Sequence, residues 1–222
     1  NAVLHMKTIA IAMQKGGVGK STLAKALGVA GAKAGLNVLV LDMDTQQSTG
    51  QWAERRKDPL PVVRFATEIE LPKLLRQAEE AGCDLVVIDT PPARSTEAPA
   101  AVESCDLVLV PCSPDIEAYE QLPRTARLAR STEKPAAAVL TMAQPNSRAE
   151  EDIARQVFET VRLPMVPAVL HRFKVHRDAS REGMTAFEME PEGKAAAELQ
   201  ALWQWVAAEL QLSTSAPVHK RA

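Results

Sequence analysis

Cysteine is scarce in this sequence, long apolar runs are missing, and basic residues are not in excess. Three cysteines, Cys83, Cys105 and Cys112, occur among 222 residues without the spacing of a metal site. We therefore expect free, packed thiols in a reducing cytoplasm and no disulfide framework. The longest apolar runs, such as 38–41 and 107–110, are too short to span a bilayer. Because the formal net charge is -2, any contact with nucleic acid requires a local basic patch.

Short apolar runs rich in β-branched residues alternate with longer stretches of helical periodicity. The runs predict strands at 7–13, 38–41, 85–88, 107–111 and 137–141, and a further strand near 165–169. Helices are predicted at 21–34 with a stop at Gly35, at 71–81 with a stop at Gly82, and at 193–212. Alternating strands and helices at this spacing predict an α/β fold, in which a doubly wound, mostly parallel sheet is flanked by helices.

The chain is expected to contain one domain, at residues 6–212. Residues 1–5 precede Met6 and resemble the remnant of an expression tag, and the polar residues 213–222 are expected to form a flexible tail. The polar positions of the helix predicted at 193–212 carry Glu and Gln and no basic stripe. We therefore expect this helix to dock on the core and not on a membrane surface.

A glycine-rich segment follows the first predicted strand and opens the first predicted helix, which is the context of a phosphate-binding loop. Backbone N–H groups of such a loop surround phosphates, Lys20 can reach the β- and γ-phosphates, and the Ser21 hydroxyl can ligate Mg²⁺. The candidate phosphate-binding residues are Lys15, Gly16, Gly17, Val18, Gly19, Lys20, Ser21 and Thr22.

Two further strands are predicted to end in carboxylates at the same crevice. Asp89 ends the run LVVID and can hold Mg²⁺ through water. Asp42 and Asp44 end the run LVLDMD, and alternation along a strand would direct both side chains to one side. The pair could then position metal-bound and attacking water, although either residue could instead cap the following helix. Asp84 lies at the opposite end of its strand and is expected to be a turn or cap residue.

The segments KGGVGKST, DMDTQQS and VVIDTPP, in this order and in these strand contexts, resemble the ParA/MinD family of deviant Walker ATPases. The resemblance implies a P-loop fold, ATP and Mg²⁺ as cofactors, and a homodimer in the ATP-bound state. It also implies that Lys15 reaches the ATP of the other subunit, that Lys20 serves its own nucleotide, and that Asp44 orients the attacking water. A lysine ahead of the glycines is suited to neutralise phosphate charge presented by another subunit.

The second segment departs from the family's usual DxDPQG pattern, because Thr45 and Gln47 replace proline and glycine, so we expect a different local turn. No NKxD guanine-reading motif occurs in the sequence. The short length and the QxSxxxW pattern after the aspartates are similar to small plasmid-partition ATPases of the ParF type. This resemblance implies adenine contacts from loops near 142–146 and 164–169, with Met142 and Pro167 as candidates.

A basic segment is the candidate DNA-binding surface. Its four cations and the single carboxylate of Asp178 give a local formal charge of +3, which suits contacts with DNA phosphates irrespective of sequence. The four cations are Arg172, Lys174, Arg177 and Arg181. A second basic face is expected on a helix where Arg124, Arg127 and Arg130 recur at a spacing of three.

The leading hypothesis is a cytoplasmic, nucleoid-associated partition ATPase. ATP would drive dimerisation and non-specific DNA binding, and a ParB-like, centromere-binding or cargo-adaptor protein would stimulate slow hydrolysis. The cargo would be a plasmid or chromosome origin or, alternatively, a protein cluster such as a chemoreceptor array or a carboxysome. A membrane regulator like MinD would need a basic amphipathic terminal helix, so stable membrane binding is not expected. A redox relative like the nitrogenase iron protein would need cysteines in glycine-rich loops.

Overall fold

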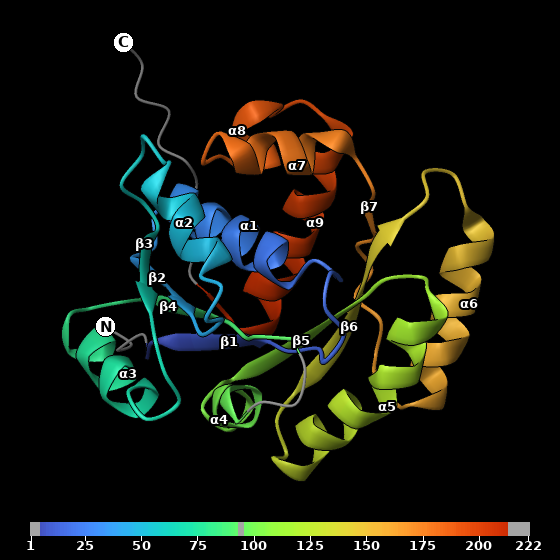
Figure 1. Cartoon of the computed structure of the whole chain (residues 1–222), viewed down its shortest axis with the longest axis horizontal. Coiled ribbons are helices and arrows are strands. Elements are labelled where there is room, and N and C mark those ends of the chain that lie inside the picture. Colours follow the sequence, from blue (N-terminus) through green and yellow to red (C-terminus); the bar gives the residue numbers. More distant parts are fainter. Residues whose placement is uncertain (1–4, 93–95, 213–222) are drawn as a thin grey trace.

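A central parallel sheet organises the chain (Figure 1), and the computed structural model describes residues 5–92 and 96–212. Within these residues the sheet has seven strands in the order β3-β2-β4-β1-β5-β6-β7, and all pairings are parallel. The strands are β1 (Lys7–Ile11), β2 (Val38–Asp42), β3 (Val62–Phe65), β4 (Leu85–Asp89), β5 (Leu107–Cys112), β6 (Ala136–Ala143) and β7 (Leu170–His171). This topology confirms the predicted doubly wound α/β fold.

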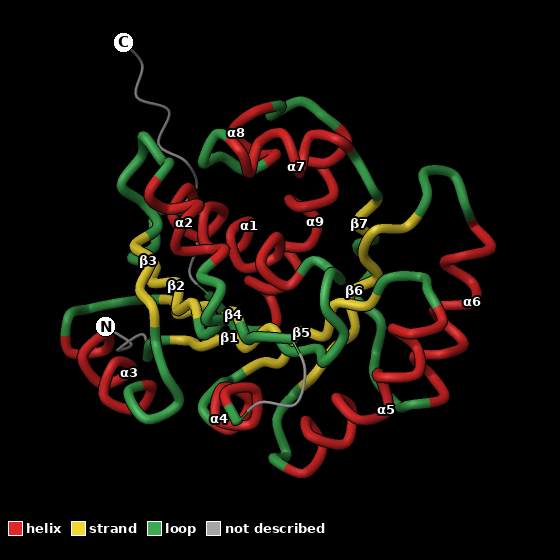
Figure 2. Tube along the Cα trace, in the orientation of Figure 1, coloured by secondary structure: helices red, strands yellow, loops and turns green. Residues whose placement is uncertain are grey.

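Helices cover both faces of the sheet, and Figure 2 shows the strands as one band between two groups of helices. One face packs against α1 (Lys20–Lys33), α7 (Lys174–Arg181), α8 (Ala186–Met189) and α9 (Lys194–Glu209), with α2 (Ser48–Glu54) beside α1. The other face packs against α3 (Leu71–Glu80), α4 (Glu97–Glu103), α5 (Ile116–Ser131) and α6 (Arg148–Thr160). Each face therefore has its own hydrophobic core.

The small residues of α1 allow this helix to lie very close to the sheet. A Cβ atom added at Gly28 would lie 2.7 Å from Val40 Cγ2, and one added at Gly31 would lie 2.9 Å from Val38 Cγ2. Such distances are shorter than van der Waals contact, so only glycine fits at these two positions without movement of the neighbours. α1 ends as predicted, because Gly35 adopts a φ of 87° directly after the C-cap.

The strand predicted near 165–169 is wrong in its position. Met165 makes an isolated bridge to Ala138, and the regular pairing with β6 begins only at Leu170. Pro167 lies between these two points and has no N–H group to donate to a ladder.

β3 is the strand that the sequence did not reveal. It is a short edge strand whose Val62 and Phe65 side chains are exposed, so it lacks the pattern of a buried run.

The terminal helix α9 docks on the core as expected. Leu199, Leu202, Trp203 and Val206 are buried in it. No helix in the described part of the chain is long and apolar enough to cross a membrane. The expected tail at 213–222, and residues 1–4 of the expected tag remnant, lie outside the described residues.

The cysteines are free, and Cys105 and Cys112 are buried. Burial raises the pKa of the Cys105 thiol to about 11 and that of Cys112 to about 12. These thiols therefore stay protonated at neutral pH and behave as packing residues, as the sequence predicts.

Candidate functional site

The glycine-rich segment forms a loop at the carboxyl end of β1, where α1 begins. Gly17 and Gly19 have φ angles of 79° and 93°, in the left-handed region that glycine enters without strain. α1 starts directly afterwards at Lys20, so the first N–H groups of the helix, including that of Ser21, face the loop without intrahelical partners. The segment from Gly16 to Thr22 thus has the geometry of an anion site at a helix N-terminus.

The two lysines of the loop differ in their surroundings. Lys20 is 6% exposed, and its Nζ donates a hydrogen bond to the Lys15 carbonyl oxygen at 3.2 Å. Burial lowers the pKa of Lys20, and the negative charges of Asp89 and Asp44 oppose this effect. The Lys15 side chain is half-buried, and its ammonium has no hydrogen bond or ion pair within the described residues. Lys20 therefore points into its own loop, whereas the charge of Lys15 acts on the Asp115 carboxylate without a hydrogen bond or ion pair.

Asp89 lies at the carboxyl end of β4 and is completely buried beside the loop. Its Oδ2 accepts a hydrogen bond from Thr49 Oγ1 at 2.7 Å, and its Oδ1 has no partner among the described residues. Burial raises the pKa of Asp89 to about 6, against the opposing effects of the hydroxyls of Thr49 and Ser21 and of the Lys20 charge. An unpartnered buried carboxylate oxygen marks a position that favours a cation or a water bound to one.

The residues present fit a hydrated Mg²⁺ that also binds phosphate. Ser21 Oγ accepts a hydrogen bond from Ser48 Oγ at 3.1 Å, so it lies at the contact between α1 and α2 and close to Asp89. No group of three or more His, Cys, Asp or Glu side chains that could hold a metal occurs in the described ranges. Mg²⁺ often keeps several waters and binds through one or two protein groups plus substrate phosphates, so a site of this size suits it.

Asp42 caps the N-terminus of α2, which is the alternative role that the sequence left open for one of the two aspartates. It is completely buried, its Oδ2 accepts hydrogen bonds from the N–H groups of Thr49 and Gly50 at 3.0 and 2.9 Å, and its Oδ1 accepts one from Asp44 N at 3.0 Å. Burial raises the pKa of Asp42, and these bonds oppose the change. Both oxygens are thus occupied by the backbone, which favours the cap over the catalytic role predicted for Asp42.

Asp44 lies two residues beyond the end of β2, so a turn and not strand alternation sets the direction of its side chain. It opens a turn in which Gln47 N donates to the Asp44 carbonyl oxygen at 2.8 Å and Gln46 N donates to Asp44 Oδ1 at 2.9 Å. Gln47 adopts φ 49°, in the left-handed region where glycine is favoured. Asp44 is half-buried, and its charge acts on the Lys20 ammonium, so it faces the crevice from the turn.

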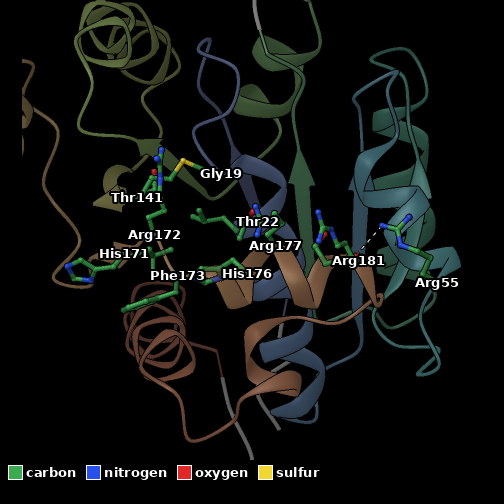
Figure 3. Close-up of a pocket in the computed structure, with 14 residues that line it drawn as sticks. Gly19, Thr22, Arg55, Thr141, His171, Arg172, Phe173, His176, Arg177 and Arg181 are labelled. Atoms are coloured by element: carbon green, nitrogen blue, oxygen red, sulfur yellow. Dashed lines mark hydrogen bonds between the residues drawn. The ribbon is translucent and has the colours of Figure 1, made fainter. Parts of the chain in front are cut away.

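A cavity of about 710 Å³ adjoins the loop, and Figure 3 draws the residues that line it. It runs from Gly19 and Thr141 past His176 to Arg55 and Arg181. Met142, which was predicted to contact the base, lies in its wall. Pro167 does not line the cavity. Met165 pairs with Ala138, near the start of β6, and the chain reaches the carboxyl edge of the sheet only at Leu170, which pairs with Thr141. Leu170, His171, Arg172 and Phe173 line the cavity instead.

Three of the four predicted DNA-binding residues line the same cavity. Arg172, Arg177 and Arg181 contribute to its wall, whereas Lys174 lies outside it. Asp178 lies within 3.4 to 3.8 Å of nitrogen atoms of Lys174, Arg177 and Arg181, whose side chains are 64% to 77% exposed. Such exposed pairs are weak. α7 therefore presents an accessible basic face, partly offset by one carboxylate, next to the phosphate loop.

Sequence reasoning missed two contributions of α2. Thr49 holds Asp89 by a hydrogen bond that links α2 to β4. At the other end of α2, Trp52 Nε1 donates to the Met184 carbonyl oxygen at 3.0 Å, and Arg56 forms an ion pair with Glu188 at 2.9 Å. These partners are 40 to 132 residues away along the chain, so no local pattern indicates them.

Backbone N–H groups gathered around a glycine loop suit a phosphate chain, and the adjoining cavity has room for a nucleoside. The fold and the site together thus define a phosphate-loop nucleotide-binding protein. The family model described as the CobQ/CobB/MinD/ParA nucleotide binding domain matches residues 9–186. The chain belongs to this family, which confirms the resemblance to ParA and MinD.

Individual relatives agree with this assignment. The chain is 34% identical over 211 residues to the "Maintenance of carboxysome distribution protein A" of Gloeobacter kilaueensis, covering 93% of this chain and 94% of the relative. It is 33% identical over 201 residues to the "Chromosome partitioning protein ParA" of Caulobacter vibrioides, covering 68% and 75%. The structure of the septum site-determining protein MinD of Pyrococcus horikoshii, complexed with Mg-ADP, superposes with a TM-score of 0.76 at 20% identity, covering 90% and 96%.

Proposed function

We propose that this protein is a Mg²⁺-dependent ATPase that dimerises on binding ATP, binds DNA without sequence preference as a dimer, and positions a cargo with the help of a partner protein. One observation carries the proposal: Lys20 bonds within its own loop, whereas the Lys15 ammonium has no hydrogen bond or ion pair in the described structure, although its charge acts on the Asp115 carboxylate. A second cation at the mouth of a phosphate site serves best a phosphate chain that another subunit presents.

The residues of the loop divide the work of binding and hydrolysis. The N–H groups of the loop and Lys20 would hold the phosphates, while Ser21 and Asp89 would hold Mg²⁺, which when bound neutralises charge on the phosphates. Asp44 would orient the attacking water from its turn, because the other carboxylate of the pair, Asp42, is committed to capping α2. The proposed site therefore contains the Asp44 carboxylate at the crevice, with one oxygen bonded to Gln46 N, and the buried Asp89 carboxylate beside the metal position.

The basic face of α7 supports the proposed contact with DNA. It carries cations but few carboxylates in a chain whose formal net charge is -2, and it lies beside the cavity next to the phosphate loop. In a two-fold dimer this face occurs twice, which doubles the number of phosphate contacts and makes binding depend strongly on assembly.

Two kinds of cargo are supported by the relatives. A plasmid or chromosome origin agrees with the similarity to a chromosome partitioning protein. A protein cluster agrees with the similarity to a carboxysome distribution protein, which extends over nearly the full length of both chains. A partner recruited from the neighbouring genes would distinguish them: a small DNA-binding protein implies an origin, whereas a cargo component implies a cluster.

The proposal is tested by DNA co-sedimentation and size-exclusion chromatography with no nucleotide, with ADP, with ATP and with a slowly hydrolysed ATP analogue. The expected result is a dimer that pellets with unrelated DNA sequences only with ATP or the analogue. DNA binding that does not depend on the nucleotide would contradict the proposal that ATP controls dimerisation and DNA binding.

Two variants separate the steps of the cycle. Lys15→Gln should bind ATP but remain a monomer, and Asp44→Ala should bind ATP and accumulate as a dimer that hydrolyses slowly. Normal dimerisation and hydrolysis by Lys15→Gln would show that Lys15 does not act across the interface.

A further inference from the structure

A second basic hollow lies between the C-terminal ends of α5 and α6, away from the phosphate loop. It has a volume of about 360 Å³ and is lined by Pro123, Arg127, Arg130, Thr160, Val161 and Arg162, a set named here the arginine groove. Each of its helices leads into the start of the next strand or bridge of the sheet. The groove therefore lies at the amino edge of the parallel sheet, whereas the phosphate loop lies at the carboxyl edge.

The cations of the groove are available to a ligand. Arg130 Nη1 donates to the Val161 carbonyl oxygen at 2.7 Å, a bond that caps α6 and fixes this guanidinium in the wall. Arg127 and Arg162 are exposed and form no ion pair or side-chain hydrogen bond within the described residues. The ends of two helices place partial negative charge nearby, but these partial charges are smaller than three guanidinium charges. The groove thus retains a positive potential.

We propose that the arginine groove binds an acidic peptide segment of a partner protein through the carboxylates of Asp or Glu side chains. Guanidinium groups present paired N–H donors that match a carboxylate. The Thr160 hydroxyl in the same wall donates its proton to the Gln156 carbonyl oxygen at 2.9 Å, so the arginines are the donors for a ligand. Pro123 and Val161 supply apolar contact for the stem of the inserted side chain. A hollow of this kind accepts one or two side chains from a peptide.

The surroundings favour a peptide over a nucleic acid. The exposed carboxylates of Glu133 and Glu159 flank the lining residues in the sequence, so a continuous polyanion would meet like charge on leaving the groove. A duplex also presents its phosphates on a convex surface, whereas these arginines line a recess. On α7, by contrast, Lys174 lies outside the neighbouring cavity and its side chain is 77% exposed, so this helix offers DNA a cation on an open surface.

The inference names the chemistry of a partner and so rests on the proposed need for one. It is tested without nucleotide, which separates its failure from a failure of the ATP switch. Fluorescence anisotropy at low ionic strength would compare a labelled hexaglutamate peptide, a hexaglutamine peptide and a short random-sequence duplex. The protein should bind hexaglutamate saturably, with an affinity that falls as salt is added, and should not bind hexaglutamine.

The double variant Arg127→Gln/Arg162→Gln removes two unpaired charges and leaves the bond of Arg130 intact. It should weaken hexaglutamate binding by about tenfold or more, since two guanidinium groups that could form charge-assisted bonds with carboxylates are lost. The control Lys73→Gln/Arg76→Gln removes two exposed charges from α3, near the other end of the sheet, and should leave the affinity within about twofold.

Three outcomes would overturn the proposal. The first is no saturable binding of hexaglutamate by the unmodified protein. The second is equal affinity of the groove variant and the α3 control variant. The third, measured for the duplex with the slowly hydrolysed ATP analogue present, is a loss of duplex binding in the groove variant as large as its loss of peptide binding, which would assign the groove to nucleic acid.

Discussion

At the scale of single residues, Thr49 influences the protonation state of Asp89, the buried carboxylate beside the phosphate loop. Its hydroxyl provides the hydrogen bond to Asp89 Oδ2 in a completely buried contact, and the other oxygen of Asp89 is already unpartnered in the described structure. Without this bond Asp89 would favour its protonated form further, because burial already raises its pKa to about 6. A protonated carboxyl is a poor partner for Mg²⁺.

Thr49→Val should therefore weaken the apparent affinity for Mg²⁺ in nucleotide binding by about 10- to 100-fold, the usual effect of losing a group that orients a metal-binding residue. A titration of Mg²⁺ with a fluorescent ATP analogue measures this. Thr49→Ser keeps the hydroxyl and should behave like the unmodified protein. An unchanged Mg²⁺ requirement in Thr49→Val would show that Asp89 does not act through this hydrogen bond.

At the scale of elements, the close contact between α1 and β2 predicts that a glycine-to-alanine substitution in α1 destabilises the protein, whereas the same substitution in α2 stabilises it. Gly28→Ala places a Cβ 2.7 Å from Val40 Cγ2 and should lower the free energy of unfolding by about 1–3 kcal/mol through overpacking. Gly50→Ala in α2 meets only ordinary contacts, 3.6 Å and longer, and should raise the free energy of unfolding by roughly 0.5–1 kcal/mol. Urea denaturation of the two variants measures both. Equal effects would contradict the tight packing of α1.

The ion pair between Arg56, which follows α2, and Glu188 of α8 is nearly buried, with side-chain exposures of 4% for Arg56 and 13% for Glu188. Arg56→Met leaves the Glu188 carboxylate without its cation and should destabilise the fold by about 3–5 kcal/mol. Arg55→Met is the control, because Arg55 is exposed and donates one hydrogen bond to Ser180 O at 3.2 Å. Thermal unfolding measures both variants, and similar losses would show that the buried pair has no special contribution.

The same pair gives stability a defined dependence on pH. Burial alone would raise the pKa of Glu188, but hydrogen bonds from Arg56 and Thr185 outweigh it and lower the pKa below its ordinary value of 4.5. The stabilisation is therefore complete above about pH 4.5 and is lost as the pH falls through the lowered, folded-state value. Glu188→Gln should flatten this acid limb of the stability curve. An unchanged acid limb would assign the pH dependence to other carboxylates.

At the scale of the whole molecule, the sequence predicted most of the fold and the centre of the site. Completely buried strands such as β4 have no polar residue before their end, so their position and the location of Asp89 are readable from a short segment. β3 was missed because its apolar side chains are exposed, and Thr49 because its partner is 40 residues away. The sequence could not show that Pro167 lies outside the cavity lining, because the offset between β6 and the following chain depends on pairing, which no local pattern encodes.

Binding to DNA is a property of the proposed dimer as a whole, and its salt dependence is the measurable quantity. Lys174→Ala/Arg181→Ala on α7 should weaken binding to unrelated sequences equally. It should also reduce the slope of log affinity against log salt by about 1 for each DNA phosphate that the protein no longer neutralises. The exposed pair Lys73→Ala/Arg76→Ala on α3 is the matched control. If both double variants gave the same slope, α7 would not be the DNA surface.

The position of Trp52 has a practical consequence for observing the protein at work. The indole is completely buried, with the Arg56 guanidinium 4.5 Å and the Lys25 ammonium 5.9 Å from its ring, and it bonds to the chain just before α8. Its helix also holds Ser48 and Thr49, which bond to the nucleotide end of the molecule. With Trp203 and Trp205 replaced by phenylalanine, Trp52 is the remaining source of tryptophan fluorescence. Its emission then reports, without an added label, movement between the phosphate loop and α7.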